Sequence, residues 1–231
     1  MLRATTIFVI FATLIPVLRT ARETKGANVT SFFLVATPDL PDPLFQQSVI
    51  LVLPPTQIPF VAGLIINKPT TIPVSRLFSR VPALKNQALA YFGGPVDLTK
   101  PSLVMRASEP TENVTRLFDD VYVSTNQGSI AKLLRDGLRP AKDPRLFFGH
   151  AQWTLDQLHA EIVEGAWYVV PAKADLIFSA DPGRVWRVLV ERAQIHEADD
   201  RRFGHRTQNL PTFSSQGLLV DASDSAFCQP F

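Results

Sequence analysis

The sequence has very little cysteine and no bias of charge. Cys228 is the single cysteine among 231 residues, which excludes an intramolecular disulfide and the zinc sites built from several cysteines. The 23 basic and 21 acidic residues give a formal net charge of +2. This balance indicates no strong attraction to nucleic acid or to an anionic membrane, and it argues against direct nucleic-acid binding. The G-x-S-x-G pattern of many serine hydrolases is also absent.

Long hydrophobic runs are scarce as well, with one exception near the start. Residues 7–18 form an uncharged apolar run between Arg3 and Arg19. That length matches the core of a signal peptide and is short of the roughly 20 residues that span a membrane. We expect the segment to place the chain outside the cytoplasm, in the periplasm for example, or to associate it with a membrane. The alternatives are an uncleaved anchor and a wrongly assigned start codon, the latter leaving a cytoplasmic protein.

The remainder is rich enough in apolar residues for a large core, since 46% of the chain is hydrophobic and 19% is charged. Strands come first and alternate with helices later, which predicts an α+β fold. The expected strands are 31–37, 48–53, 61–66, 88–92, 102–106, 120–124, 145–149 and 166–172. The expected helices are 74–81, 128–137 capped by Ser124 or Thr125, 154–164 capped by Thr154, and one that follows Asp181-Pro182. We divide the chain into residues 1–30 (leader-like segment and linker), 31–195 (folded domain) and 196–231 (polar extension).

The stretch "GHAQWTLDQLHAEIVEGAW" (149–167) holds two of the four histidines and two of the three tryptophans. Leu155, Leu158 and Ile162 form the apolar stripe of the expected helix. The polar residues of that helix lie off the stripe, so we predict that they are solvated and bind no metal: His159, Glu161 and Glu164. We place His150 in a loop between strand and helix, where it lines a cleft or makes a local hydrogen bond.

Several other polar or glycine-containing turns follow expected strands. Because turns at one end of a sheet come together, we predict that these turns and His150 converge on one shallow surface. The alternative is that each is a tight turn or a cap with a local role. The candidate binding surface consists of Asp39, Asp42, Asn67, Lys68, Gly93, Gly94 and His150. We assign no catalytic residue, no cofactor and no metal ligand.

Four stretches, in this order, resemble the YqgE/AlgH family. They are "FLVATPDLPDPLFQQSVILV" (33–52), "GLIINKP" (63–69), "GGPV" (93–96) and the 149–167 stretch. The resemblance implies an α+β fold in which a bifurcated β-sheet curls into a pseudo-barrel with helices packed outside. It implies no established enzyme activity and no cofactor, and it includes bacterial members described as transcriptional regulators. His150 departs from the family pattern, which usually has a tyrosine there.

Three functions remain open at this stage. The first is a non-enzymatic regulatory or binding protein with a protein or small-molecule partner. The second is a small-molecule-binding or hydrolytic site near Asp42, Asn67, Gly93 and His150. The third is a DNA-binding transcriptional regulator, against which the near-neutral charge and the lack of a recognisable reading helix stand.

Overall fold

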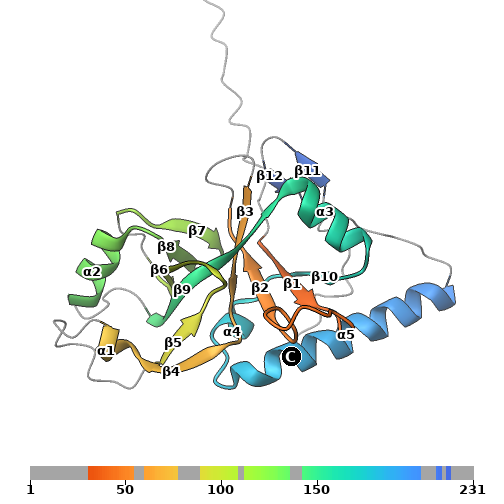
Figure 1. The fold of residues 1–231 in the computed structure, drawn as a ribbon, viewed down its shortest axis with the longest axis horizontal. Helices are drawn as coiled ribbons and strands as arrows, with labels where there is room; N and C mark the ends of the chain where they lie inside the picture. The colour runs from red at the N-terminus through yellow and green to blue at the C-terminus, as the bar shows by residue number, and fades with distance from the viewer. Residues whose placement is uncertain are drawn as a thin grey trace, which may run out of the picture.

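The computed structural model describes residues 31–54, 60–77, 89–108, 112–135, 142–203, 212–214 and 217–219. Within these ranges the fold is α+β, and a large curled sheet carries helices on its outside (Figure 1). The strands of the large sheet are β1 (Phe32–Ala36), β2 (Val49–Val52), β3 (Phe60–Ile65), β4 (Pro69–Pro73), β5 (Leu89–Phe92), β6 (Val96–Arg106), β7 (Thr115–Phe118), β8 (Val121–Ser124), β9 (Lys142–Thr154) and β10 (Trp167–Pro171). The short strands β11 (Thr212–Ser214) and β12 (Gly217–Leu219) pair with each other. The helices are α1 (Val74–Leu77), α2 (Gln127–Arg135), α3 (Leu155–Val163), α4 (Ala174–Ile177) and α5 (Pro182–Phe203).

The sheet forks along β9, which confirms the bifurcated, curled architecture implied by the family resemblance. The main path of strands runs β10-β1-β2-β3-β9-β6-β8-β7. The last residues of β9, from Ala151 on, pair with β3, whereas its earlier residues pair with β6 and, in parallel, with β5. One long strand is therefore shared by two wings of the sheet, and the fork lies near Gly149 and His150.

Strand β1 lies in the part of the sheet formed by β10, β1, β2 and β3, and its side chains are buried on both faces of the sheet. All five of its residues are buried, and successive side chains point to opposite faces of a sheet. Phe33 and Val35 join a core with residues of α4 and α5, while Phe32 and Leu34 join a second core with residues of α3. A third core lies under α2, around Ile130 and Leu134. Continuous apolar runs such as "FFLVA" are the expected signature of strands buried on both faces.

Two helix caps were tested by the structure. Thr154 caps α3 as predicted, because its hydroxyl accepts a 3.1 Å hydrogen bond from the backbone N–H of Gln157. The prediction for α2 was wrong. The side chain of Asn126 accepts from the N–H of Ser129 at 2.9 Å, whereas Ser124 ends β8 and its hydroxyl donates to the carbonyl of Asn113.

Strands β4 and β7 and helix α4 are among the elements that lay outside the predicted pattern, and α5 continues beyond residue 195, the end of the proposed folded domain. Strands β4 and β7 are short and largely exposed, and α4 is a single turn, so none has a hydrophobic period long enough to read. Helix α5 continues through residue 195 to Phe203. The expected helix 74–81 is present as α1, and its later residues lie outside the described part of the chain, as do the leader-like residues 1–30.

Candidate functional site

The loop 38–47 joins β1 to β2 and is a rigid, exposed turn. Its prolines Pro38, Pro41 and Pro43 are all exposed and limit the backbone angles. The carboxylate of Asp42 accepts a 2.8 Å hydrogen bond from the N–H of Leu44. The carbonyl of Asp42 accepts from two further backbone N–H groups in the loop. Asp42 therefore organises the turn while its side chain faces solvent, and Asp39 lies exposed in the same loop.

Asn67 and Lys68 fasten this loop to the end of β3. The Asn67 side chain is 7% exposed, and its carbonyl oxygen accepts from the N–H of Val49 at 2.8 Å. Its amide group donates to the carbonyl of Gln47, also at 2.8 Å. The Nζ of Lys68 donates to the carbonyl oxygen of Leu44 at 2.6 Å. Both polar atoms of the Asn67 side chain are thus hydrogen-bonded to backbone groups. The neighbouring Lys68 is more accessible to solvent.

An aromatic cluster packs against the loop 38–47 through Phe45. Phe45 packs against Trp153 and Trp167, with ring centroids 6.1 and 6.0 Å away. Oε2 of Glu161 accepts hydrogen bonds from both indole N–H groups, at 2.9 and 2.8 Å. Its Oε1 accepts from the side chain of Gln157 at 2.9 Å. Buried or half-buried polar groups need such partners, and here one carboxylate serves both tryptophans.

The prediction that Glu161 lies on a solvated face was therefore wrong. His159 and Glu164 are exposed, as predicted. Glu161 differs because its indole partners come from β9 and β10, eight and six residues away along the chain. The helical periodicity around Glu161 does not indicate these contacts. The two tryptophans that flank the helix, with a carboxylate between them in sequence, are a signal that could have suggested an indole–carboxylate contact.

Gly93, Gly94 and His150 form a second group, at the fork of the sheet. The carbonyl of Gly93 accepts from the N–H of Ile65 on β3, and its N–H donates to the carbonyl of Phe148 on β9. A Cβ on Gly94 would overlap the backbone of His150. These glycines are required because two backbones approach closely at the fork.

His150 lies within β9, and the prediction that it occupies a loop was wrong. It pairs with Val96 in the β6–β9 ladder, because β9 continues five residues beyond the apolar run that marked its predicted end. Its Nε2 lies 3.2 Å from the side-chain oxygen of Gln152. The hydrogen bond from Lys100 holds the pKa of Asp97 below its usual value, and the nearby charge of His150 acts in the same direction.

The structure thus gathers the predicted surface into two groups. Asp42, Asn67 and Lys68 meet at the loop 38–47, and Gly93, Gly94 and His150 meet at the fork. A backbone hydrogen bond from the N–H of Phe92 to the carbonyl of Lys68, 3.0 Å long, links the two regions. That both groups face one common ligand stays a prediction.

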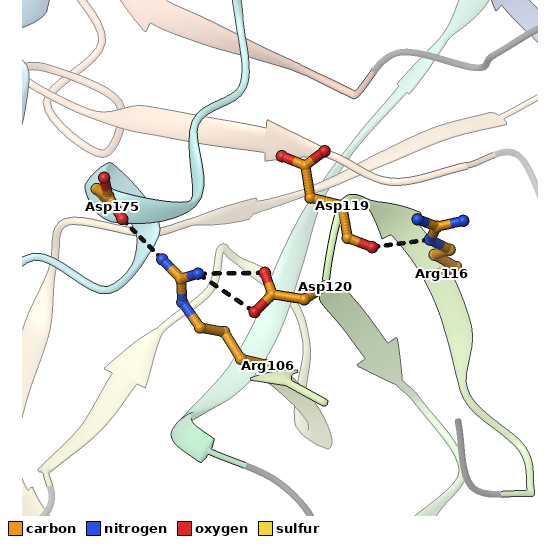
Figure 2. Close-up of polar contacts among 5 residues, drawn as sticks. All are labelled: Arg106, Arg116, Asp119, Asp120 and Asp175. Carbon is orange, nitrogen blue, oxygen red and sulfur yellow. Dashed lines mark hydrogen bonds and ion pairs between the residues drawn. The ribbon is translucent and has the colours of Figure 1, made fainter. Parts of the chain in front are cut away.

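Two arginines form a further polar cluster that the sequence did not indicate. Arg106 donates to both carboxylate oxygens of Asp120, at 3.1 and 3.3 Å, and to Asp175 at 2.7 Å (Figure 2). Its guanidinium also lies 5.3 Å from the ring centroid of Phe178. Arg145, on the neighbouring strand, donates to the carbonyl of Ser179 at 2.8 Å. Asp175, Phe178 and Ser179 belong to α4 and the residues after it. Arg106 and Arg145 therefore attach this segment to strands β6 and β9.

Neither a metal site nor a membrane span emerges from the parts of the chain that the structure describes. Within those ranges, no three histidine, cysteine or acidic side chains are grouped so as to hold a metal ion. In the same ranges no helix combines the length and the apolar character needed to cross a membrane.

Comparison with known proteins identifies relatives over most of the chain. The AlgH-like family model matches residues 33–198. A UPF0301 protein of Thermobifida fusca is 32% identical over 176 residues, covering 71% of this chain and 87% of that protein. A UPF0301 protein of Azoarcus is 30% identical over 165 residues, covering 69% and 86%.

Two solved structures share the fold. The crystal structure of protein DIP2367 from Corynebacterium diphtheriae has a TM-score of 0.60 at 24% identity, covering 71% of this chain and 86% of that one. The solution structure of the AlgH protein from Pseudomonas aeruginosa has a TM-score of 0.56 at 22% identity, covering 81% and 98%. With the family model matching most of its length, the chain belongs to the AlgH-like family, a family of uncharacterised function.

Proposed function

We propose that this chain is a non-enzymatic binding protein that presents the loop 38–47 to a protein partner and thereby acts in regulation. One observation carries the proposal: the polar side chains around the loop hold it in one shape, while its outer residues stay exposed. Leu44, at the tip of the turn, is 49% exposed, yet both its N–H and its carbonyl are fixed by side chains of Asp42 and Lys68.

A rigid, exposed loop favours binding because little conformational entropy is lost when a partner engages it. Proline contributes by restricting the free loop as well as the bound one. The outer residues combine an apolar side chain, Leu44, with the carboxylates of Asp39 and Asp42. This surface fits a partner that offers an apolar contact beside basic groups.

The hydrolytic alternative has less support from the same geometry. Asn67 is buried and both polar atoms of its side chain are engaged with backbone groups. Gly93 is enclosed by β3 and β9. Only Asp42 and His150 of that proposed site keep accessible side chains, and they belong to different groups of the surface.

Site-specific crosslinking in cells tests the proposal. A photoreactive amino acid replaces Leu44 in one full-length variant and Val163, which is 60% exposed on α3, in a matched control. We expect a discrete protein adduct from position 44, absent from position 163 and lost when Asp42→Ala is added. Equal adducts from both positions, or none from position 44, would oppose the proposal.

Two solution measurements address the alternatives. A rise in melting temperature on addition of a small metabolite, lost in His150→Ala, would favour the small-molecule site instead. Binding to duplex DNA with an affinity that falls steeply with salt would favour the DNA-binding alternative.

A further inference from the structure

Strand β10 lies at one end of the large sheet. In the part of the chain that the structure describes, it pairs with β1 and with no other strand. Helix α3 packs against one face of β10 and α5 against the other, because Trp167 belongs to the core that includes residues of α3 and Val170 to the core that includes residues of α5. The faces of β10 are thus covered by helices, and its outer edge has no partner strand among the described elements.

The hydrogen bonds to β1 show which backbone groups of β10 point outward. On the β1 side, the carbonyl of Ala166 accepts a hydrogen bond and the N–H of Ala172 donates one. Because such bonds recur at every second residue of an antiparallel strand, the even-numbered residues of β10 bond to β1 and the odd-numbered ones point away from it. The outward groups are the N–H and carbonyl of Trp167 and Val169 and the carbonyl of Pro171. Within the described ranges, the backbone N–H groups of Trp167 and Val169 have no hydrogen-bond acceptor.

Strand β10 also lacks the features that protect the other edges of the sheet. Edge strands are usually protected by charged side chains, prolines or bulges. Strand β7 has the exposed Arg116 and a shift of register, and β4 begins and ends with Pro69 and Pro73. The sequence of β10, "WYVVP", has no charged residue, its register with β1 is regular, and its proline is the last residue. An uncharged and regular edge favours pairing with a further strand.

We propose that β10 is the contact surface of a symmetric dimer, in which it pairs in antiparallel fashion with β10 of a second copy of this chain. With the two-fold axis at Val169, the N–H of each Val169 donates to the carbonyl of the other. The N–H of each Trp167 donates to the carbonyl of Pro171 in the other copy. Pro171 serves only as an acceptor in these bonds, so its missing N–H does not prevent them.

The residues at the two ends of β10 favour a second copy as the occupant. Glu164 precedes the strand and Lys173 follows it, so the antiparallel arrangement brings the lysine of each copy to the end that has the glutamate of the other. The half-buried side chains of Tyr168 and Val169 meet equally apolar neighbours. A strand of five residues makes a short contact, and we therefore expect dissociation in the micromolar range. This inference does not depend on the partner suggested for the loop 38–47.

Sedimentation equilibrium of the full chain, from low to high micromolar concentration, tests the proposal. Val169→Pro removes an outward N–H and leaves the hydrogen bonds to β1 intact, so it should raise the dissociation constant of the dimer at least about tenfold. Val169→Thr keeps the N–H and the branched side chain, and this control should dimerise as the unaltered chain does. A chain that is monomeric throughout, or a Val169→Pro variant that dimerises as tightly as Val169→Thr, would overturn the proposal.

The charges at the strand ends provide a second test, which leaves the backbone unchanged. Lys173→Glu and Glu164→Lys should each raise the dissociation constant at least about threefold, and the double variant should restore it. A double variant weaker than both single variants would overturn the antiparallel pairing.

Amide hydrogen exchange in the unaltered chain identifies what covers the edge. The N–H of Val169 should exchange slowly at high concentration and rapidly on dilution, while the N–H of Val170, which bonds to β1, should exchange slowly at both. Slow exchange at Val169 at every concentration would mean that another segment of the same chain covers the edge, and would overturn the dimer.

Discussion

The indole rings of Trp153 and Trp167 meet edge to face, with centroids 6.0 Å apart and planes at 87°. This is a favoured geometry for an aromatic pair, and both indole N–H groups point to the same carboxylate oxygen, Oε2 of Glu161. Phe45 packs against both rings. The exposed loop that contains Phe45 is therefore seated on an aromatic platform that one glutamate holds together.

Removing the glutamate should destabilise the platform. In Glu161→Ala the two indole donors lose their acceptor, which costs about 1–3 kcal/mol of unfolding free energy for each buried donor left unsatisfied. We expect a lower urea midpoint and a changed tryptophan emission maximum. Glu161→Gln keeps an acceptor oxygen and should lose less. Glu164→Ala, at the exposed end of the same helix, is the control, and a loss as large as that of Glu161→Ala would contradict this role.

Truncating one ring of the platform should cost still more. Trp167 is 4% exposed, and replacing a buried tryptophan by alanine typically costs about 3–5 kcal/mol. Trp167→Ala should therefore lower the melting temperature markedly. His159→Ala and Glu164→Ala change exposed side chains and should leave it nearly unchanged. Thermal unfolding followed by circular dichroism compares the three, and equal melting temperatures would refute the structural role of Trp167.

Substitutions at Asn67 and at Asp42 should differ in their effect on stability, because Asn67 is buried and Asp42 is exposed. Asn67→Ala leaves the N–H of Val49 without its buried acceptor, and we expect a loss of about 1–3 kcal/mol. Asp42→Ala removes a carboxylate in an exposed turn and should cost less than about 1 kcal/mol. Urea unfolding measures both. A larger loss in Asp42→Ala than in Asn67→Ala would show that the turn, and not the buried amide, secures the loop.

The cluster around Arg106 should contribute modestly, because its acidic partners are exposed. The side chain of Asp175 is 79% exposed, and exposed ion pairs contribute about 0–1 kcal/mol. Arg106→Ala also loses the contact with Phe178, so we expect a total loss of about 1–2 kcal/mol. Lys100→Ala, which breaks an exposed pair with Asp97, is the matched control. Unfolding at low and high salt distinguishes them, since only the ionic part is screened.

The sequence predicted the strands of the core well because their apolar runs are uninterrupted, as in "FFLVA" and "VILV". The sequence did not predict the features that tertiary contacts determine. Strand β9 runs on past Gly149 because His150 still pairs with β6 and β3 takes over the pairing from Ala151, and no local pattern in the sequence indicates that exchange. The candidate surface was defined from turns, so it included Asn67, whose polar side chain turns inward to buried backbone groups. Glu161 was missed because its partners come from two other elements.

Comparing alanine substitutions at Gly94 and Gly165 tests whether the close backbone approach at the fork of the sheet requires glycine. Gly94 has a φ of +147°, which disfavours any side chain, and a Cβ there would also overlap the backbone of His150 and Ala151. Gly165, after α3, has a φ of +80°, but a Cβ at that position would meet no atom within 4 Å. Gly165→Ala should therefore cost about 1 kcal/mol, from backbone strain alone.

Gly94→Ala should cost considerably more, about 3 kcal/mol or above, because backbone atoms cannot move aside without separating β9 from the strands that pair with it. Unfolding in urea compares the two variants, and amide hydrogen exchange in residues 146–152 locates the damage. Equal losses in the two variants, with unchanged exchange in β9, would mean that the close approach at the fork is not what requires glycine at position 94.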